Sequence, residues 1–245
     1  MSPARTPLLA GLSLLAAGWL FGGQRPSPAQ LLPPVLQEPQ QQAVAAPAFA
    51  VHRGGIDYRI APVADYEIAG LVVSRHDTRT WWDMRHWVAN DYLNVVDLCV
   101  VWGANAAEGA YEHMSFFSGQ WTCYFRYADS SRVKAAHLRA LSNNHLLTDR
   151  NDIARQLLGV RVGDQVRLRG QLVSYSHDEG FHFQRGTSVS RDDEGDGACE
   201  TVFVQQVEIL RRGAAWPQLL RWLGWALLLL GGVIWWRTPF GARAW

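Results

Sequence analysis

The feature that most constrains this chain is an apolar stretch near its carboxyl end, residues 216–236. Pro217 suits the first turn of a helix, and Arg221 is the only charged residue of the stretch. About 20 helical residues span roughly 30 Å, the thickness of a bilayer's hydrocarbon core. Indole rings favour the headgroup level, and tryptophans lie near both ends: Trp216, Trp222, Trp225, Trp235 and Trp236. We expect a transmembrane helix over residues 216–237 and a short tail over 238–245; the alternative is a buried helix of a soluble protein.

A second apolar run, residues 7–23, follows Arg5 at the amino end. Its uninterrupted part, residues 8–21, is short for a membrane span, and residues 27–29 offer small side chains of the kind a signal peptidase reads. Residues 1–23 are therefore either an uncleaved signal anchor or a cleaved signal peptide. Both direct export, although arginines flank both apolar runs and do not fix the orientation.

Between the apolar runs, residues 24–50 are rich in proline, glutamine and alanine and predict a flexible linker. Residues 51–213 are long enough to bury a core of their own. The formal net charge is +1, which gives no bulk attraction to nucleic acid, so we expect no nucleic-acid partner. Lys134 is the only lysine, and this arginine bias is typical of a GC-rich bacterial genome.

Five segments of the central region have strand-like composition and are separated by Gly, Asp and Asn clusters: residues 66–74, 95–102, 114–127, 165–175 and 201–210. Gly119 suggests a bulge in the third. One clear helix begins after Thr148 or Asn151 and ends before Gly159, and a weaker helical pattern covers residues 132–141. The predicted order is three strands, a helix and two strands.

Residues 162–173 place a Gly-Asp turn before an alternating strand with a glycine in its middle, Gly170. This pattern, with the order of elements, resembles the OB-fold, a five-stranded Greek-key barrel whose helix lies between strands three and four. Together with residues 142–145, it also resembles uncharacterised bacterial membrane proteins. We therefore predict a mainly β chain with one or two helices, its small OB-like barrel lying between the N-terminal hydrophobic segment and the C-terminal transmembrane helix. Another small barrel or a sandwich is the alternative.

The OB resemblance directs attention to the loops between strands 1–2 and 4–5, because these flank the ligand face of OB domains. Here they are long, residues 76–87 and 176–200. Trp81 and Trp82 could stack on a ligand, or could close the end of the barrel or lie in the membrane interface. Arg185 could bind an anion, or could pair with an acid of its own loop.

A third polar candidate precedes the predicted helix. Asn143, Asn144 and His145 could orient a ligand, but a structural turn is the favoured interpretation because Asn-Asn bonds its own backbone in turns.

Two metal hypotheses are weak. His76, Asp83 and His86 could join His177, Asp178 and His182 across the two loops. Residues 192–197 resemble the start of a calcium-binding EF-hand loop, but Phe203 stands where the bidentate glutamate is required. Neither His-Glu-x-x-His nor Gly-x-Ser-x-Gly occurs. No metal or cofactor is predicted, and a non-enzymatic role is favoured over an enzymatic one.

The three cysteines suit an oxidising compartment but leave one unpaired. A Cys123–Cys199 bridge is one possibility, and Cys99, in an apolar run, is interpreted as a small buried hydrophobe.

These observations predict a membrane-anchored envelope protein in the bacterial inner membrane, with its β-domain facing the periplasm or the cell exterior. The domain would bind a partner protein, a glycan or a small ligand near the membrane. The candidate ligand-binding residues are Trp81, Trp82, Asn143, Asn144, His145 and Arg185. The alternative is a metal-dependent hydrolase that uses the His and Asp residues of the two long loops.

Overall fold

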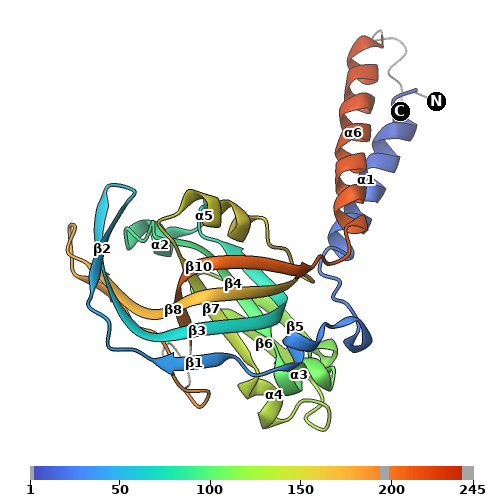
Figure 1. Cartoon of the computed structure of the whole chain (residues 1–245). Coiled ribbons are helices and arrows are strands. Elements are labelled where there is room, and N and C mark those ends of the chain that lie inside the picture. The colour runs from blue at the N-terminus through green and yellow to red at the C-terminus, as the bar shows by residue number, and fades with distance from the viewer. Residues whose placement is uncertain (1–2, 194–198, 239–245) are drawn as a thin grey trace. The chain divides into compact units, whose positions relative to one another are not determined.

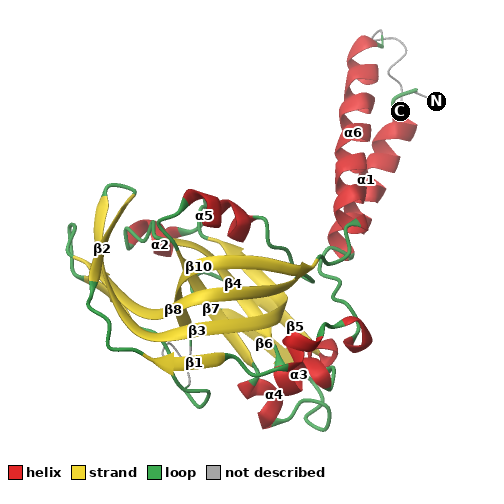
Figure 2. Ribbon diagram, viewed as in Figure 1, coloured by secondary structure: helices red, strands yellow, loops and turns green. Residues whose placement is uncertain are grey.

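The structure is a computed structural model that describes residues 3–193 and 199–238. The chain forms two compact units: a helical unit, Met1–Gln24 with Ala214–Trp245, and a β-unit, Arg25–Gly213 (Figure 1). The protein is mainly β, with six α-helices in the part of the chain that the structure describes (Figure 2).

The helical unit consists of α1 (Arg5–Leu20) and α6 (Trp216–Arg237), which pack in antiparallel fashion. Glycines allow the close approach: a Cβ on Gly11 would lie 2.8 Å from the carbonyl oxygen of Gly224. The helix predicted at the carboxyl end is thus present, and its 22 residues are long and apolar enough to cross a membrane. The 16 residues of α1 fall short of the roughly 20 that a span requires.

Five strands of the β-unit close into a ring: β3 (Ile56–Asp77), β4 (Asn94–Val101), β7 (Leu141–Leu147), β10 (Glu200–Arg211) and β8 (Gln165–His177), in that order. The pairing of β8 with β3 closes the ring. Neighbours are antiparallel except β7 and β10, which are parallel. Shorter strands extend the sheet: β1 (Gln40–Ala43), β2 (Phe49–Arg53) and β9 (Phe183–Arg185).

The remaining elements lie outside the ring. Strands β5 (Met114–Ser118) and β6 (Cys123–Tyr127) form a separate hairpin. The short helices are α2 (Met84–Val88), α3 (Gly103–Ala107), α4 (Ala135–Arg139) and α5 (Asn151–Leu158), with 3-10 helices at Pro28–Gln30, Pro33–Leu36 and Ala110–His113. Helix α5 is the predicted one, ends before Gly159, and packs Ile153 and Leu157 into the main core.

The main core fills the inside of the ring because alternate residues of each strand point inward. Val96, Leu98 and Val100 of β4 belong to it, together with residues of the other four ring strands and α5. Asp97 and Cys99, which alternate with them, therefore face the outer side of the ring. Both are completely buried, so other elements cover the ring there.

The prediction of the third strand was wrong. Residues 114–127 form the β5–β6 hairpin, whose turn contains Gly119, and the third ring strand is β7. The favoured turn at residues 142–145 is therefore also wrong, because these residues belong to β7 and are buried. The backbone N–H and C=O groups of these residues form their hydrogen bonds with β4 and β10, whereas in a turn they would bond to neighbouring residues. The weaker helical pattern over residues 132–141 corresponds to the shorter α4.

Two further predictions were wrong. The segment expected to be a flexible linker instead packs on the β-unit: β1 pairs with β3, and Val35 is fully buried. Its few apolar residues suffice because Leu31 and Val35 pack against buried residues of β3 and β4. The disulfide joins Cys99 to Cys123, not Cys123 to Cys199, and Cys199 is free. The buried Cys99 lies under the hairpin that carries Cys123, a proximity that only the tertiary structure creates.

Candidate ligand-binding cleft

A row of polar residues crosses the outer face of the ring. The strand register places His76 of β3 opposite Asp97 of β4, and Asp97 opposite His145 of β7. All three side chains are at most 3% exposed. Buried groups of this kind require partners, which come from one another, from Asn94 of β4, from Arg185 of β9 and from the segment that follows β3.

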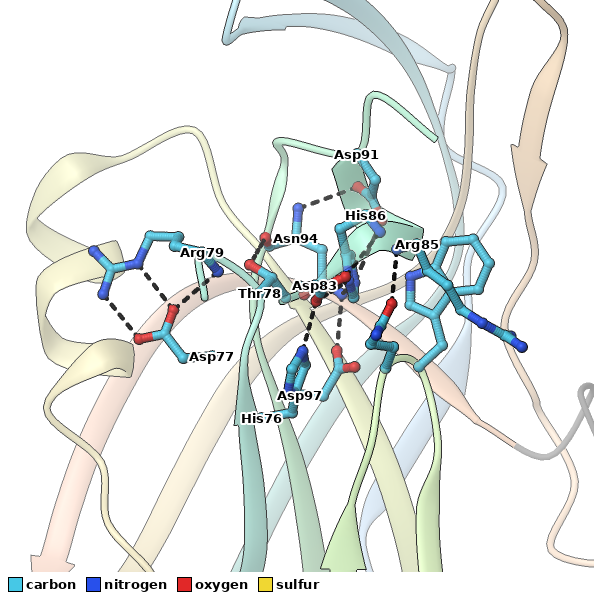
Figure 3. A network of polar contacts seen from close by, with 12 residues as sticks. His76, Asp77, Thr78, Arg79, Asp83, Arg85, His86, Asp91, Asn94 and Asp97 are labelled. Atoms are coloured by element: carbon cyan, nitrogen blue, oxygen red, sulfur yellow. Dashed lines mark hydrogen bonds and ion pairs between the residues drawn. The ribbon is translucent and has the colours of Figure 1, made fainter. Parts of the chain in front are cut away.

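Asp83 binds both a helix end and two imidazoles. It caps α2, with Oδ1 accepting a hydrogen bond from the backbone N–H of His86 at 3.0 Å. Its Oδ2 lies 2.5 Å from Nε2 of His76 and 2.6 Å from Nδ1 of His86, and Figure 3 shows Asp83 between the two rings. One carboxylate thus connects the end of β3 to α2.

An amide and a second carboxylate continue the network toward β7. Asn94 Nδ2 lies 2.9 Å from Nε2 of His86 and donates to Oδ1 of Asp97 at 2.8 Å (Figure 3). His145 Nδ1 lies 2.7 Å from the same Asp97 oxygen. We call these linked residues the His–Asp network: His76, Asp83, His86, Asn94, Asp97 and His145.

The network shifts the pKa values of its members in opposite directions. Burial opposes ionisation of Asp97, but His145 and Asn94 hold its pKa below the ordinary value. Burial likewise opposes the charged form of His86, yet the carboxylates around it, led by Asp83, raise its pKa. Burial lowers the pKa of His145 although Asp97 acts against it. We therefore interpret His145 as neutral.

His145 connects the network to a pair of arginines. A terminal nitrogen of Arg185 lies 2.6 Å from Nε2 of His145, so Nε2 accepts and Nδ1 carries the proton donated to Asp97. The Arg185 guanidinium lies 4.7 Å from the centroid of the Trp121 ring, and that of Arg85 lies 5.8 Å from it. Arg85, Trp121 and Arg185 are called the arginine wall below.

Trp121 lies at the tip of the β5–β6 hairpin, and hydrogen bonds to neighbouring segments hold this tip in place. Trp121 has a φ of 68°, which is uncommon outside glycine. Gln120 accepts from the backbone N–H of Arg85 at 2.7 Å and donates to the carbonyl of Trp82 at 3.1 Å. Asn143 donates to the Trp121 carbonyl at 3.2 Å. The hairpin is also bound to β4 through the Cys99–Cys123 disulfide.

The arginine wall borders a cleft of about 1060 Å³. Other lining residues come from β7, α4, the hairpin and the segment after β9, among them Leu138, Arg139, Asn143, Arg191, Asp192, Cys199 and Glu200. Arg139 is paired with Asp192 at 2.7 Å, and Arg191 is paired with Glu200. Within the described residues, neither Arg85 nor Arg185 has an acidic partner.

Two further cleft residues are chemically distinctive. Glu200 is 2% exposed, and burial raises its pKa to about 7 even though Arg191 acts in the opposite direction. Burial also raises the pKa of the Cys199 thiol to about 11, so it is a poor nucleophile at neutral pH.

The structure separates the six predicted ligand-binding residues. Asn143 and Arg185 line the cleft, and His145 lies behind Arg185. Asn144 faces the ring interior and donates to the Ser142 hydroxyl at 3.0 Å. Of the two predicted tryptophans, Trp81 is 92% exposed, and Trp82 packs on His76 with ring centroids 4.8 Å apart.

Of the two groups of residues in the cross-loop metal hypothesis, only the first forms a cluster that could hold a metal ion. The ligand atoms of His76, Asp83 and His86 all lie within 4.8 Å of one another. The second trio lies elsewhere: His177 Nε2 is 2.8 Å from the carbonyl oxygen of Ala89, and His182 and Asp178 form an exposed pair. The segment with EF-hand-like spacing, residues 192–197, lies largely outside the described residues.

Sequence reasoning missed Arg85, Trp121 and Asp97. Arg85 belongs to the first long loop, but Trp81 and Trp82 were chosen as the ligand-binding candidates of that loop. Trp121 fell within a predicted strand. Asp97 interrupts an apolar run, and an acid among Val and Leu residues was a usable signal of a buried polar site.

The chain matches no family model, no curated protein and no solved structure.

Proposed function

We propose that this chain is a membrane-anchored envelope protein whose β-unit binds a partner protein, a glycan or a small ligand in the cleft. The observation that carries the proposal is the arginine wall on the cleft, held by a hydrogen bond from the Arg85 backbone N–H to Gln120, one from Asn143 to the Trp121 carbonyl, and a disulfide. A recognition surface needs such a fixed set of donors.

We further propose that the ring is an OB-like barrel. Its strand order, the parallel pairing of β7 with β10, and the position of α5 between the third and fourth ring strands support this assignment. The site agrees with it as well. Asn143 comes from β7, Arg85 from α2 in the connection between β3 and β4, and Arg185 from β9 in the connection between β8 and β10. In sequence order of the ring strands these are strand 3 and connections 1–2 and 4–5, the regions that OB domains use for ligands.

The location proposed for the protein is the bacterial inner membrane, with the β-unit on the periplasmic or outer side. A Cys99–Cys123 disulfide supports an oxidising compartment. The glycine contacts between α1 and α6 support a retained signal anchor, because cleavage would remove the partner of α6. A membrane-impermeant maleimide, applied to intact cells carrying single cysteines at Ser190 or Ala242, tests the orientation. Labelling is expected at 190 only, and labelling at 242 only would contradict it.

Photocrosslinking in intact cells tests the function. A benzoylphenylalanine replaces Leu138, which lines the cleft, or Gln206, which is exposed and does not line it. Adducts specific to position 138 are expected, and they should disappear when Arg85 and Arg185 are both changed to glutamine. Identical adduct patterns at the two positions would contradict a binding role for the cleft.

The second candidate is the metal-dependent hydrolase, which the His76, Asp83 and His86 cluster favours. We rank it second because these side chains are at most 3% exposed, whereas a catalytic metal needs an open coordination position. Elemental analysis of the purified full chain separates the candidates. A stoichiometric transition metal that is lost with His86→Ala would support the hydrolase, and its absence would remove this candidate.

A further inference from the structure

We propose that the arginine wall binds an oxyanion, a carboxylate or phosphate group carried by the ligand of the cleft. This inference rests on the proposed binding function and specifies the chemistry of the ligand. It follows from three independent properties of Arg85, Trp121 and Arg185: their charge, an unused hydrogen-bond donor and their fixed geometry.

The charge of the wall is not compensated locally. Arg185 contacts the neutral imidazole of His145, and that contact uses one of its donors without neutralising its charge. Arg85 is exposed, and its guanidinium contacts the Trp121 ring. The other two cleft arginines, Arg139 and Arg191, each pair with a carboxylate. Two positive charges on one aromatic ring repel each other, and a bound anion relieves that repulsion.

The wall also contains a donor without an acceptor. The indole Nε1–H of Trp121 is buried and has no hydrogen-bond partner among the described residues. An unsatisfied buried donor costs about 1–3 kcal/mol. An oxyanion beside the two guanidinium groups would supply the acceptor that Trp121 lacks once the side chains that cover its indole N–H move aside.

The geometry is set before any ligand arrives. The positive φ of Trp121 is a strained conformation of the kind that concentrates at ligand sites. Gln120 and Asn143 fix the backbone of the hairpin tip, and His145 orients Arg185. Planar guanidinium groups match the paired oxygens of carboxylate and phosphate, whereas a neutral ligand would leave both charges unused.

Nuclear magnetic resonance of the full chain in detergent micelles tests the proposal. The indole N–H signal of Trp121, assigned by its loss in Trp121→Phe, is followed during titration with inorganic phosphate or glucuronate at constant ionic strength, with chloride as the reference. A saturable shift is expected with at least one probe, and the probe that binds more tightly identifies phosphate or carboxylate as the group. Arg85→Gln and Arg185→Gln should each weaken binding about 10- to 100-fold.

Arg139→Gln is the matched control, because Arg139 lines the same cleft but is already paired with Asp192. It should leave the affinity within about twofold of wild type. No shift with either probe up to about 100 mM, or equal losses in all three arginine variants, would overturn the oxyanion site. Cleft-specific crosslinking at position 138 in that case would leave the binding function intact and remove only the inference about charge.

Discussion

The His–Asp network and the arginine wall are neighbours joined by the contact between His145 and Arg185, yet they are built in opposite ways. In the network, carboxylates face imidazoles and an amide at hydrogen-bond distance. In the wall, two guanidinium groups face an aromatic ring and no carboxylate among the described residues. Paired buried groups maintain a structure, and unpaired groups beside a cleft are available to a ligand.

This difference predicts a separation of effects. Substitutions in the network should change the free energy of unfolding, and substitutions in the wall should change binding. The hydrogen bond between His145 and Asp97 should therefore contribute to stability, and the Arg185 side chain that His145 orients should contribute to binding.

The largest loss of stability is expected for Asp97→Ala. The substitution leaves the buried donors of His145 and Asn94 without their acceptor, and we expect the free energy of unfolding to fall by about 3–5 kcal/mol. Urea denaturation of the full chain in micelles measures it. Asp77→Ala is the control, because Asp77 pairs mainly with the exposed Arg79 and should lose under about 1 kcal/mol. Equal losses in the two variants would refute the structural role of the network.

Removal of the disulfide should affect both regions. Replacing Cys99 and Cys123 by alanine should lower the free energy of unfolding by about 2–4 kcal/mol. It should also weaken oxyanion binding, because the hairpin that carries Trp121 loses its covalent link to β4. Cys199→Ala, which removes the free thiol, serves as the control. Unchanged oxyanion affinity without the disulfide would mean that hydrogen bonds alone position the hairpin tip.

Glu200 should make stability depend on pH. Its folded-state pKa is about 7, above the ordinary 4.5, so its stabilising contribution is complete below pH 4.5 and is lost as the pH rises through 7. The loss amounts to about 3 kcal/mol at most. Glu200→Gln removes this dependence. As the pH rises across this range, the unfolding free energy of the wild type should fall relative to that of Glu200→Gln, and parallel curves would contradict the raised pKa.

The smallest effect on stability is expected for Arg85→Gln. The contact of its guanidinium with Trp121, at 5.8 Å, is worth about 0.5 kcal/mol. Urea denaturation should therefore show a change within about 0.5 kcal/mol, although oxyanion binding falls at least about tenfold. A loss of more than about 2 kcal/mol would place Arg85 among the structural residues and erase the contrast with Asp97.

The parts of the fold that were predictable depend on local pattern. The alternation of β8, the apolar run of β4 and the glycine after α5 all act within a few residues. Strand β7 was missed because Asn143 and His145 are polar, and only Trp121, Asp97 and Arg185, distant in the sequence, make their burial possible. A local pattern cannot report such partners.

The candidate site likewise contains residues that could be predicted from local sequence and residues that could not. Arg185 and Asn143 were predicted from the loop and the polar cluster that contain them. The wall itself was not, because Trp121 reaches Arg85 and Arg185 only when the hairpin folds over the outer face of the ring. The Cys99–Cys123 pairing depends on the same tertiary arrangement, which the spacing of three cysteines does not encode.

The most direct measurement is the unfolding free energy of the full chain in micelles as a function of the concentration of the tighter-binding probe, phosphate or glucuronate, at constant ionic strength. A ligand that binds only the folded state adds about 1.4 kcal/mol for each tenfold increase above its dissociation constant. We expect this slope for the wild type and for Arg139→Gln, and no slope for the protein in which both Arg85 and Arg185 are changed to glutamine. The same slope in all three proteins would contradict the claim that the arginine wall is the binding site.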